Sequence, residues 1–149
     1  MSLYCIYLPD GSIRHSTKVY DPDGLKYDEQ LKERGETFIT VPESPGLLPP
    51  DLWYVHTGAL ELRERPIMKN VRIDKTRIKC DDKDTSITSG IPTGTRILVI
   101  MFDGTIINDA MSQGPLLEIT LPVECTVRVI LQKWPYRDYI YEIEGVLQP

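Results

Sequence analysis

Residues Arg96–Ile106, with the sequence RILVIMFDGTI, decide the fold class of this chain. The run Arg96–Ile100 is apolar at every position after the arginine, which is typical of a central strand that is buried on both faces of its sheet. Asp103-Gly104 follows between apolar residues, and this dipeptide is a strong signal for a tight β-hairpin. The stretch therefore predicts two paired strands, the first of them in the interior of a sheet.

Further short strands are predicted on both sides of this hairpin. Alternating apolar and polar residues bounded by turn residues place them at residues 71–73, 77–80, 85–88, 116–121, 126–131 and 139–143. Because no helical periodicity separates them, two packed antiparallel sheets are favoured over a parallel α/β sheet. We predict an immunoglobulin-like antiparallel β-sandwich for residues 67–149. The term covers architecture alone, since neither Cys80 nor Cys125 has the tryptophan partner found in antibody domains.

Residues 1–66 predict a small N-terminal α+β subdomain, so that the chain as a whole is mainly β. Asp10-Gly11 lies between two strand-like segments and predicts a hairpin at the N-terminus. Another hairpin is expected around Thr57-Gly58, and its end at Arg65-Pro66 is the expected boundary with the sandwich.

One short helix and one stiff connector are expected between these hairpins. Residues 25–34 carry apolar positions among charges and stop at Gly35, which predicts an amphipathic helix with a glycine cap. Residues 36–41 return to a strand pattern. Residues 42–50 hold four prolines, which predicts a connector outside the sheets.

Composition narrows the classes of function. The chain has 149 residues and is 41% hydrophobic, which is enough for a genuine core. Its net charge of -5 offers no electrostatic reason to bind nucleic acid or an anionic membrane. We also expect no membrane insertion and no general secretion, because no apolar run approaches the roughly 18 residues of a spanning helix and the N-terminus lacks a signal-peptide pattern. Cys5, Cys80 and Cys125 favour reduced thiols over a disulfide framework.

No set of residues predicts catalysis, a cofactor or a metal site. His15 and His56 are the two histidines, and each falls in a predicted hairpin without other chemistry around it. Asp81-Asp82-Lys83-Asp84 is acidic, but it lacks the ligand spacing and the glycine of a calcium loop, so a solvated turn is the better interpretation. Nucleophile-elbow, phosphate-loop and dinucleotide motifs are absent from the sequence. The sequence predicts a protein that is not an enzyme.

Aromatic residues and arginines give the candidate site. They cluster in the predicted hairpin after residue 50 and near the C-terminus, and they serve either core packing or a protein interface, where Trp, Tyr and Arg are the usual anchors. A carbohydrate-binding platform is a third interpretation. The candidate anchors are Trp53, Tyr54, Arg63, Arg65, Trp134, Tyr136 and Arg137.

The order of landmarks along the chain resembles small tail-associated proteins of bacteriophages and prophages. The landmarks are Leu8–Ile13, Thr40-Val41-Pro42, Leu52–Val55, Gly58-Ala59-Leu60, Arg65-Pro66, Thr85–Thr95 and Trp134-Pro135-Tyr136. They cover most of the chain and consist chiefly of turn and strand residues. One departure is the stretch Asp81–Asp84, which replaces the Asp-Gly turn that such modules often carry after Ile78 and leaves the strand pairing there open.

The resemblance implies a non-enzymatic structural component of the virion, made in the host bacterial cytoplasm and associated with the tail, a tail fibre or the baseplate. Its expected partners are other virion proteins and further copies of itself. The alternatives are a receptor- or glycan-binding module on the particle surface, with a cell-surface glycan as partner, and a capsid decoration protein.

Overall fold

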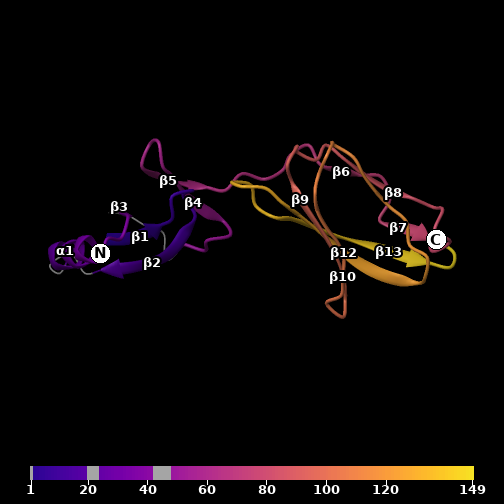
Figure 1. Ribbon diagram of the computed structural model, residues 1–149, viewed down its shortest axis with the longest axis horizontal. Coiled ribbons are helices and arrows are strands. Elements are labelled where there is room, and N and C mark those ends of the chain that lie inside the picture. Colours follow the sequence, from indigo (N-terminus) through magenta and orange to yellow (C-terminus); the bar gives the residue numbers. More distant parts are fainter. Residues whose placement is uncertain (1, 20–23, 42–47) are drawn as a thin grey trace. The chain divides into compact units, whose positions relative to one another are not determined.

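The computed structural model describes residues 2–19, 24–41 and 48–149, which divide into two compact units, Met1–Arg65 and Pro66–Pro149 (Figure 1). The described residues form one α-helix and many short strands in several sheets. The prediction of a mainly β protein is confirmed.

The first unit contains a three-stranded antiparallel sheet, a helix and a separate hairpin. Its elements are β1 (Ser2–Tyr7), β2 (Ile13–Val19), α1 (Gly24–Glu33), β3 (Phe38–Val41), β4 (Trp53–His56) and β5 (Glu61–Glu64). The sheet has the order β2-β1-β3, and β4 pairs with β5. The hairpins predicted around Asp10-Gly11 and Thr57-Gly58 are therefore confirmed.

Both faces of the central strand β1 are covered. Leu3 and Cys5 point into a core with Leu48 and Val55, while Tyr4 and Ile6 point to the other face. On that second face they pack against the buried Leu31 of α1. Leu48 belongs to the segment predicted as a connector, so this end of the segment contributes to the core; residues 42–47 lie outside the described part of the chain.

The helix ends where the sequence places a glycine. Gly35 has a φ of 71°, a left-handed conformation that glycine adopts without strain. The Gly35 N–H donates to the Lys32 carbonyl at 3.1 Å, and the Glu36 N–H donates to the Leu31 carbonyl at 3.0 Å. This pair of hydrogen bonds satisfies carbonyls of the last turn, as in a Schellman motif. The predicted glycine cap is confirmed.

The second unit contains a five-stranded and a three-stranded sheet. Its strands are β6 (Arg72–Ile73), β7 (Arg77–Lys79), β8 (Ser86–Ser89), β9 (Arg96–Met101), β10 (Ile106–Met111), β11 (Leu117–Ile119), β12 (Cys125–Gln132) and β13 (Tyr139–Val146). The larger sheet has the order β10-β9-β12-β13-β7, and the smaller has the order β11-β8-β6. The hairpin predicted around Asp103-Gly104 is confirmed as β9 and β10.

One strand pair departs from the prediction of purely antiparallel sheets, because β13 and β7 run parallel. β6 and β7 follow each other along the chain, separated by residues 74–76, and they belong to different sheets. β7 therefore has no hairpin partner and pairs with the open side of β13. The expectation of antiparallel pairing is wrong for this pair.

Side chains from both sheets form the core of this unit. Val127, Val129 and Leu131 of β12 are completely buried, and Ile119 of the smaller sheet packs in the same cluster. Burying each such side chain contributes about 1.5–3 kcal/mol. A hydrogen bond of 2.5 Å between the hydroxyls of Thr88 and Tyr141 joins β8 to β13. The two sheets are therefore held together by one continuous interior.

The strand β9 lies between β10 and β12, as its sequence predicts, but its two faces differ. Ile97 and Val99 are buried in the core, while Leu98 and Ile100 on the opposite face are half-buried. The described residues of this unit contain no helix or further sheet that could cover that second face. The expectation that β9 is buried on both faces is therefore wrong. Its uncovered face is a candidate binding surface.

Candidate protein-interaction surface

The outer face of the five-stranded sheet carries a row of apolar side chains. Leu98 lies opposite Ile130, and Ile130 lies opposite Ile140, so the row crosses β9, β12 and β13. Directly opposed residues of neighbouring strands share one face of a sheet. Ile140 is 57% exposed, and the other two are half-buried. Along each strand, the residues of this row alternate with the residues that are buried in the core.

A second group of apolar residues lies beside this row. Ile106 of β10 faces Ile100 of β9, and it is more than half exposed. Phe102 at the tip of the hairpin is 73% exposed. Ile100, Phe102 and Ile130 line a cavity of about 220 Å³ together with Arg128. We call the set of Leu98, Ile100, Phe102, Ile106, Ile130 and Ile140 the outer apolar patch.

Paired polar groups border the patch on one side. Arg96 donates two hydrogen bonds to Asp109, from Nε to Oδ1 at 2.9 Å and from Nη2 to Oδ2 at 2.8 Å. Arg96 also donates to Gln132 at 3.4 Å, and Gln132 donates to Asp138 at 3.0 Å. The hydrogen bond from Arg96 lowers the pKa of the Asp109 carboxyl, and the same contact raises the pKa of the Arg96 guanidinium. Both groups are therefore charged at neutral pH, and they compensate each other.

A further ion pair borders the patch through the strands β12 and β13. Arg128 and Glu142 approach to 3.4 Å, and they lie opposite each other in the strand register. An apolar centre inside a polar border is the usual anatomy of a protein–protein interface. Within each of the two ion pairs the charges compensate each other, so neither pair adds net charge to the border. This surface is suited to binding another protein.

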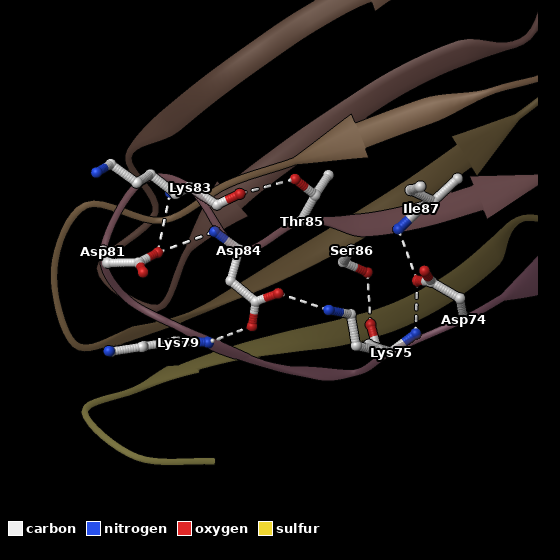
Figure 2. Close-up of polar contacts among 9 residues, drawn as sticks. All are labelled: Asp74, Lys75, Lys79, Asp81, Lys83, Asp84, Thr85, Ser86 and Ile87. Atoms are coloured by element: carbon white, nitrogen blue, oxygen red, sulfur yellow. Dashed lines mark hydrogen bonds and ion pairs between the residues drawn. The ribbon is translucent and has the colours of Figure 1, made fainter.

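The acidic segment between β7 and β8 is a folded loop, as Figure 2 shows. The Asp84 carboxylate accepts hydrogen bonds from the Lys75 ammonium at 2.5 Å and from the Lys79 backbone N–H at 2.8 Å. Asp81 Oδ1 accepts from the backbone N–H groups of Lys83 and Asp84, each at 2.9 Å. The hydrogen bonds from Lys75 and from the loop amides lower the pKa of the Asp84 and Asp81 carboxyls, respectively. Through these contacts the two carboxylates stabilise the loop.

The same loop joins the two sheets of the second unit. Asp82 adopts a left-handed conformation with a φ of 60°, and its carboxylate accepts a hydrogen bond of 2.8 Å from the Thr120 hydroxyl. Asp74, which lies between β6 and β7, accepts through Oδ1 from the Ile87 N–H of β8 at 2.7 Å (Figure 2). β7 and β8 belong to different sheets and do not pair with each other. This answers the question of strand pairing that the sequence left open. Within the described residues, no group of three or more His, Cys, Asp or Glu side chains is placed to hold a metal ion.

Four of the predicted anchors lie in the hairpin of the first unit. Trp53 is half-buried and packs against the core, and Tyr54 lies opposite Arg63 in the strand register. Arg63 Nε donates to Glu61 at 2.7 Å, and this contact raises the pKa of the guanidinium. The Arg65 backbone N–H donates to the Leu52 carbonyl at 2.7 Å, which closes the base of the hairpin.

The other three predicted anchors lie between β12 and β13 in the second unit. Trp134 is 37% exposed, and Tyr136 packs against the core. The Arg137 N–H donates to the Pro66 carbonyl at 2.8 Å, which fixes the start of the unit. The predicted anchors therefore form one group in each unit, and none of them belongs to the outer apolar patch.

The two histidines lie in the first unit. His56 ends β4, and its Nδ1 accepts a hydrogen bond of 3.0 Å from the Ala59 N–H, so it shapes the turn of the hairpin. His15 lies opposite Ile6 in the pairing of β1 with β2. The thiols of Cys5, Cys80 and Cys125 are free.

Sequence reasoning missed the outer apolar patch, although a signal for it exists. Leu98 and Ile100 occupy the second face of an apolar run, and this pattern favours burial inside the chain. Ile130 and Ile140 likewise stand at positions that alternate with core residues. An apolar second face predicts a cover, but it does not say whether the cover is part of the same chain.

Comparisons with known proteins found no relative of this chain. A scan against models of protein families, a search of the curated proteins and a search of the solved structures each gave no match for this chain. Among the residues that the structure describes, no helix is both long and apolar enough to span a membrane.

Proposed function

We propose that this chain is a non-enzymatic structural component of a bacteriophage virion, associated with the tail, a tail fibre or the baseplate, and that it acts through protein–protein assembly. The observation that carries the assembly role is the outer apolar patch with its border of paired charges. The placement in a phage particle rests on the resemblance of the landmark order to tail-associated proteins. The expected partners are other virion proteins and further copies of the chain.

We also propose that the two sheets of residues 66–149 form an immunoglobulin-like sandwich. The strand order supports this proposal: β11-β8-β6 corresponds to an E-B-A sheet, and β10-β9-β12-β13 corresponds to a C′-C-F-G sheet. β7 continues the first strand and joins the second sheet beside β13. Such a sandwich suits an assembly protein, because the outer faces of its sheets can bind other proteins.

The exposure of the patch supports an assembly role on physical grounds. Phe102, Ile106 and Ile140 are each more than half exposed, and apolar surface left in water costs about 25 cal/mol for every Å² that a partner could cover. Contiguous apolar surface of this kind on a small unit usually marks a binding site. A partner that covers the patch would remove this cost without separating any ion pair of the border.

The composition of purified particles tests the proposal. Mass spectrometry of phage or prophage particles from the bacterial strain that encodes the chain should detect the protein in fixed ratio to known tail components. Particles that assemble fully and contain none of it would contradict the virion role.

Two substitutions connect the particle to the patch. Ile140→Lys places an uncompensated charge in the apolar row, and we expect it to lower incorporation of the protein into particles. Val123→Lys is the matched control, since Val123 is 58% exposed and lies outside the patch. Equal incorporation of the two variants would mean that incorporation into particles does not depend on the outer apolar patch.

A further inference from the structure

The strand β10 is an open edge of the five-stranded sheet. Within the described part of the chain, β10 pairs with β9 alone, and all six of its residues, Ile106–Met111, are exposed. An edge strand presents a row of backbone N–H and C=O groups that can pair with another strand. The available edge is therefore a second binding feature, distinct from the outer face of the sheet.

This edge has little of the usual protection against strand pairing. Four of its six residues are apolar, namely Ile106, Ile107, Ala110 and Met111, and its one charged residue, Asp109, is already paired with Arg96 of the same chain. A register shift between Ile106 and Asn108 is its one irregularity. Natural edge strands are guarded by charges, prolines, shortness or bulges, and of these protections β10 has only the one register shift.

The opposite edge of the same sheet shows that contrast directly. β7 has three residues, and Arg77 and Lys79 are exposed on either side of the buried Ile78. A three-residue strand is a poor template for a second strand, and its Lys79 N–H is already bound by the Asp84 carboxylate at 2.8 Å. The sheet is therefore open to strand addition at β10 and guarded at β7.

We propose that β10 pairs with β10 of a second copy of this chain across a two-fold axis, which joins the two five-stranded sheets edge to edge. This inference rests on the proposed assembly function and names the partner for one surface. A two-fold pair uses the same patch on both copies, so it satisfies both open edges at once. The guarded β7 edges then stop the sheet from growing further.

Charge and shape both favour a second copy as the occupant. The chain has a net charge of -5, yet β10 brings a single charge that its own Arg96 compensates, so two such edges can approach without unpaired like charges. A space of about 200 Å³ opens beside the edge, lined by Val99, Ile107, Ile119 and neighbouring residues. The apolar side chains of an added strand would cover this space.

The size of the edge sets the expected strength. Six residues span about 20 Å, so the pair buries less than the roughly 800 Å² per partner of a standard interface. We therefore expect a dimer that forms with rising concentration.

Hydrogen exchange of the full chain, measured by mass spectrometry from dilute to concentrated solution, tests this pairing. Peptides that cover Ile106–Met111 should exchange about tenfold more slowly when about nine-tenths of the copies are paired, because exchange then proceeds from the unpaired fraction. Peptides that cover β7 should not change. Exchange at β10 that is independent of concentration would overturn the inference.

Two matched lysine substitutions locate the contact. Ile107→Lys should remove the concentration dependence at β10, whereas Ile140→Lys, three strands away and similarly exposed, should keep it. Unchanged exchange of β12 peptides in both variants verifies that the unit is folded. Loss of the effect in Ile140→Lys alone would assign self-association to the outer face and overturn edge pairing. The particle experiment tests the virion role separately, since its outcome does not depend on how two copies meet.

Discussion

Replacing Ile143 by alanine tests which face of the five-stranded sheet is the core. Ile143 lies in β13, is completely buried and contacts the core shared by both sheets. Ile140 lies in the same strand on the outer face and is 57% exposed. The two residues are chemically identical, so Ile140→Ala is a matched control for Ile143→Ala.

The expected cost follows from the side-chain atoms that are lost. Ile143→Ala removes three buried carbon groups, which is about 2.4 kcal/mol at roughly 0.8 kcal/mol for each. The cavity that remains raises the loss in the free energy of unfolding to about 4 kcal/mol. Ile140→Ala removes the same groups from a largely exposed position and should cost less than about 1 kcal/mol.

Urea unfolding followed by tryptophan fluorescence measures this difference. The chain has two tryptophans, Trp53 in the first unit and Trp134 in the second, so a Trp53→Phe background leaves Trp134 to report on residues 66–149. The measurement belongs at low protein concentration, where a partner does not bury Ile140. An Ile140→Ala cost equal to or larger than that of Ile143→Ala would mean that the faces are exchanged, and it would refute the outer apolar patch.

Four further predictions concern single residues. Ile97→Asp should abolish cooperative unfolding of the second unit, seen by calorimetry, because it buries an unpaired charge in the core. Gly90→Ala should lower the melting temperature, since Gly90 has a φ of 73° and an added Cβ would stand 1.9 Å from the Asn70 carbonyl oxygen. Burial raises the pKa of the Cys5 thiol to about 11, so the unfolded chain ionises first and the stability of the first unit should fall from about pH 9 to about pH 11. Asp84→Ala should speed hydrogen exchange at the Lys79 amide, which loses its acceptor.

Each of these predictions has a control or a contradicting result. A soluble Ile97→Asp protein that unfolds cooperatively would mean that the strand is misplaced. Gly114→Ala, at a glycine with open space around it, should be tolerated, and equal damage at both glycines would contradict the steric argument. Cys5→Ala should remove the stability change between about pH 9 and about pH 11. Lys83→Ala keeps the backbone hydrogen bonds of the loop. Faster exchange at the Lys79 amide in this variant would contradict the role given to Asp84.

The mainly β fold could be predicted because its signals are local. The alternation in Thr126–Leu131 and the turn residues Asp103-Gly104 depend on neighbouring positions alone, and the structure has strands and a hairpin at these places. The helix end at Gly35 is equally local, because it depends on a backbone conformation that glycine adopts readily.

Features that depend on distant residues could not be predicted. The parallel pairing of β7 with β13 joins segments far apart in the chain, and no turn residue announces it. Leu48 belongs to a proline-rich stretch that predicts a connector, yet it completes a core with Leu3 and Cys5. The apolar positions Leu98 and Ile130 indicate that a second face exists, but the alternation of a strand cannot tell a covered face from one that awaits a partner.

The mass of the purified full chain in solution, measured by light scattering after size exclusion over a range of concentrations, tests the central claim most directly. One chain has a mass of 17.0 kDa. An assembly protein with an exposed apolar patch and an open edge should show a mass that rises with concentration to a discrete multiple of this value. A mass of one chain at every concentration would contradict self-assembly through these surfaces.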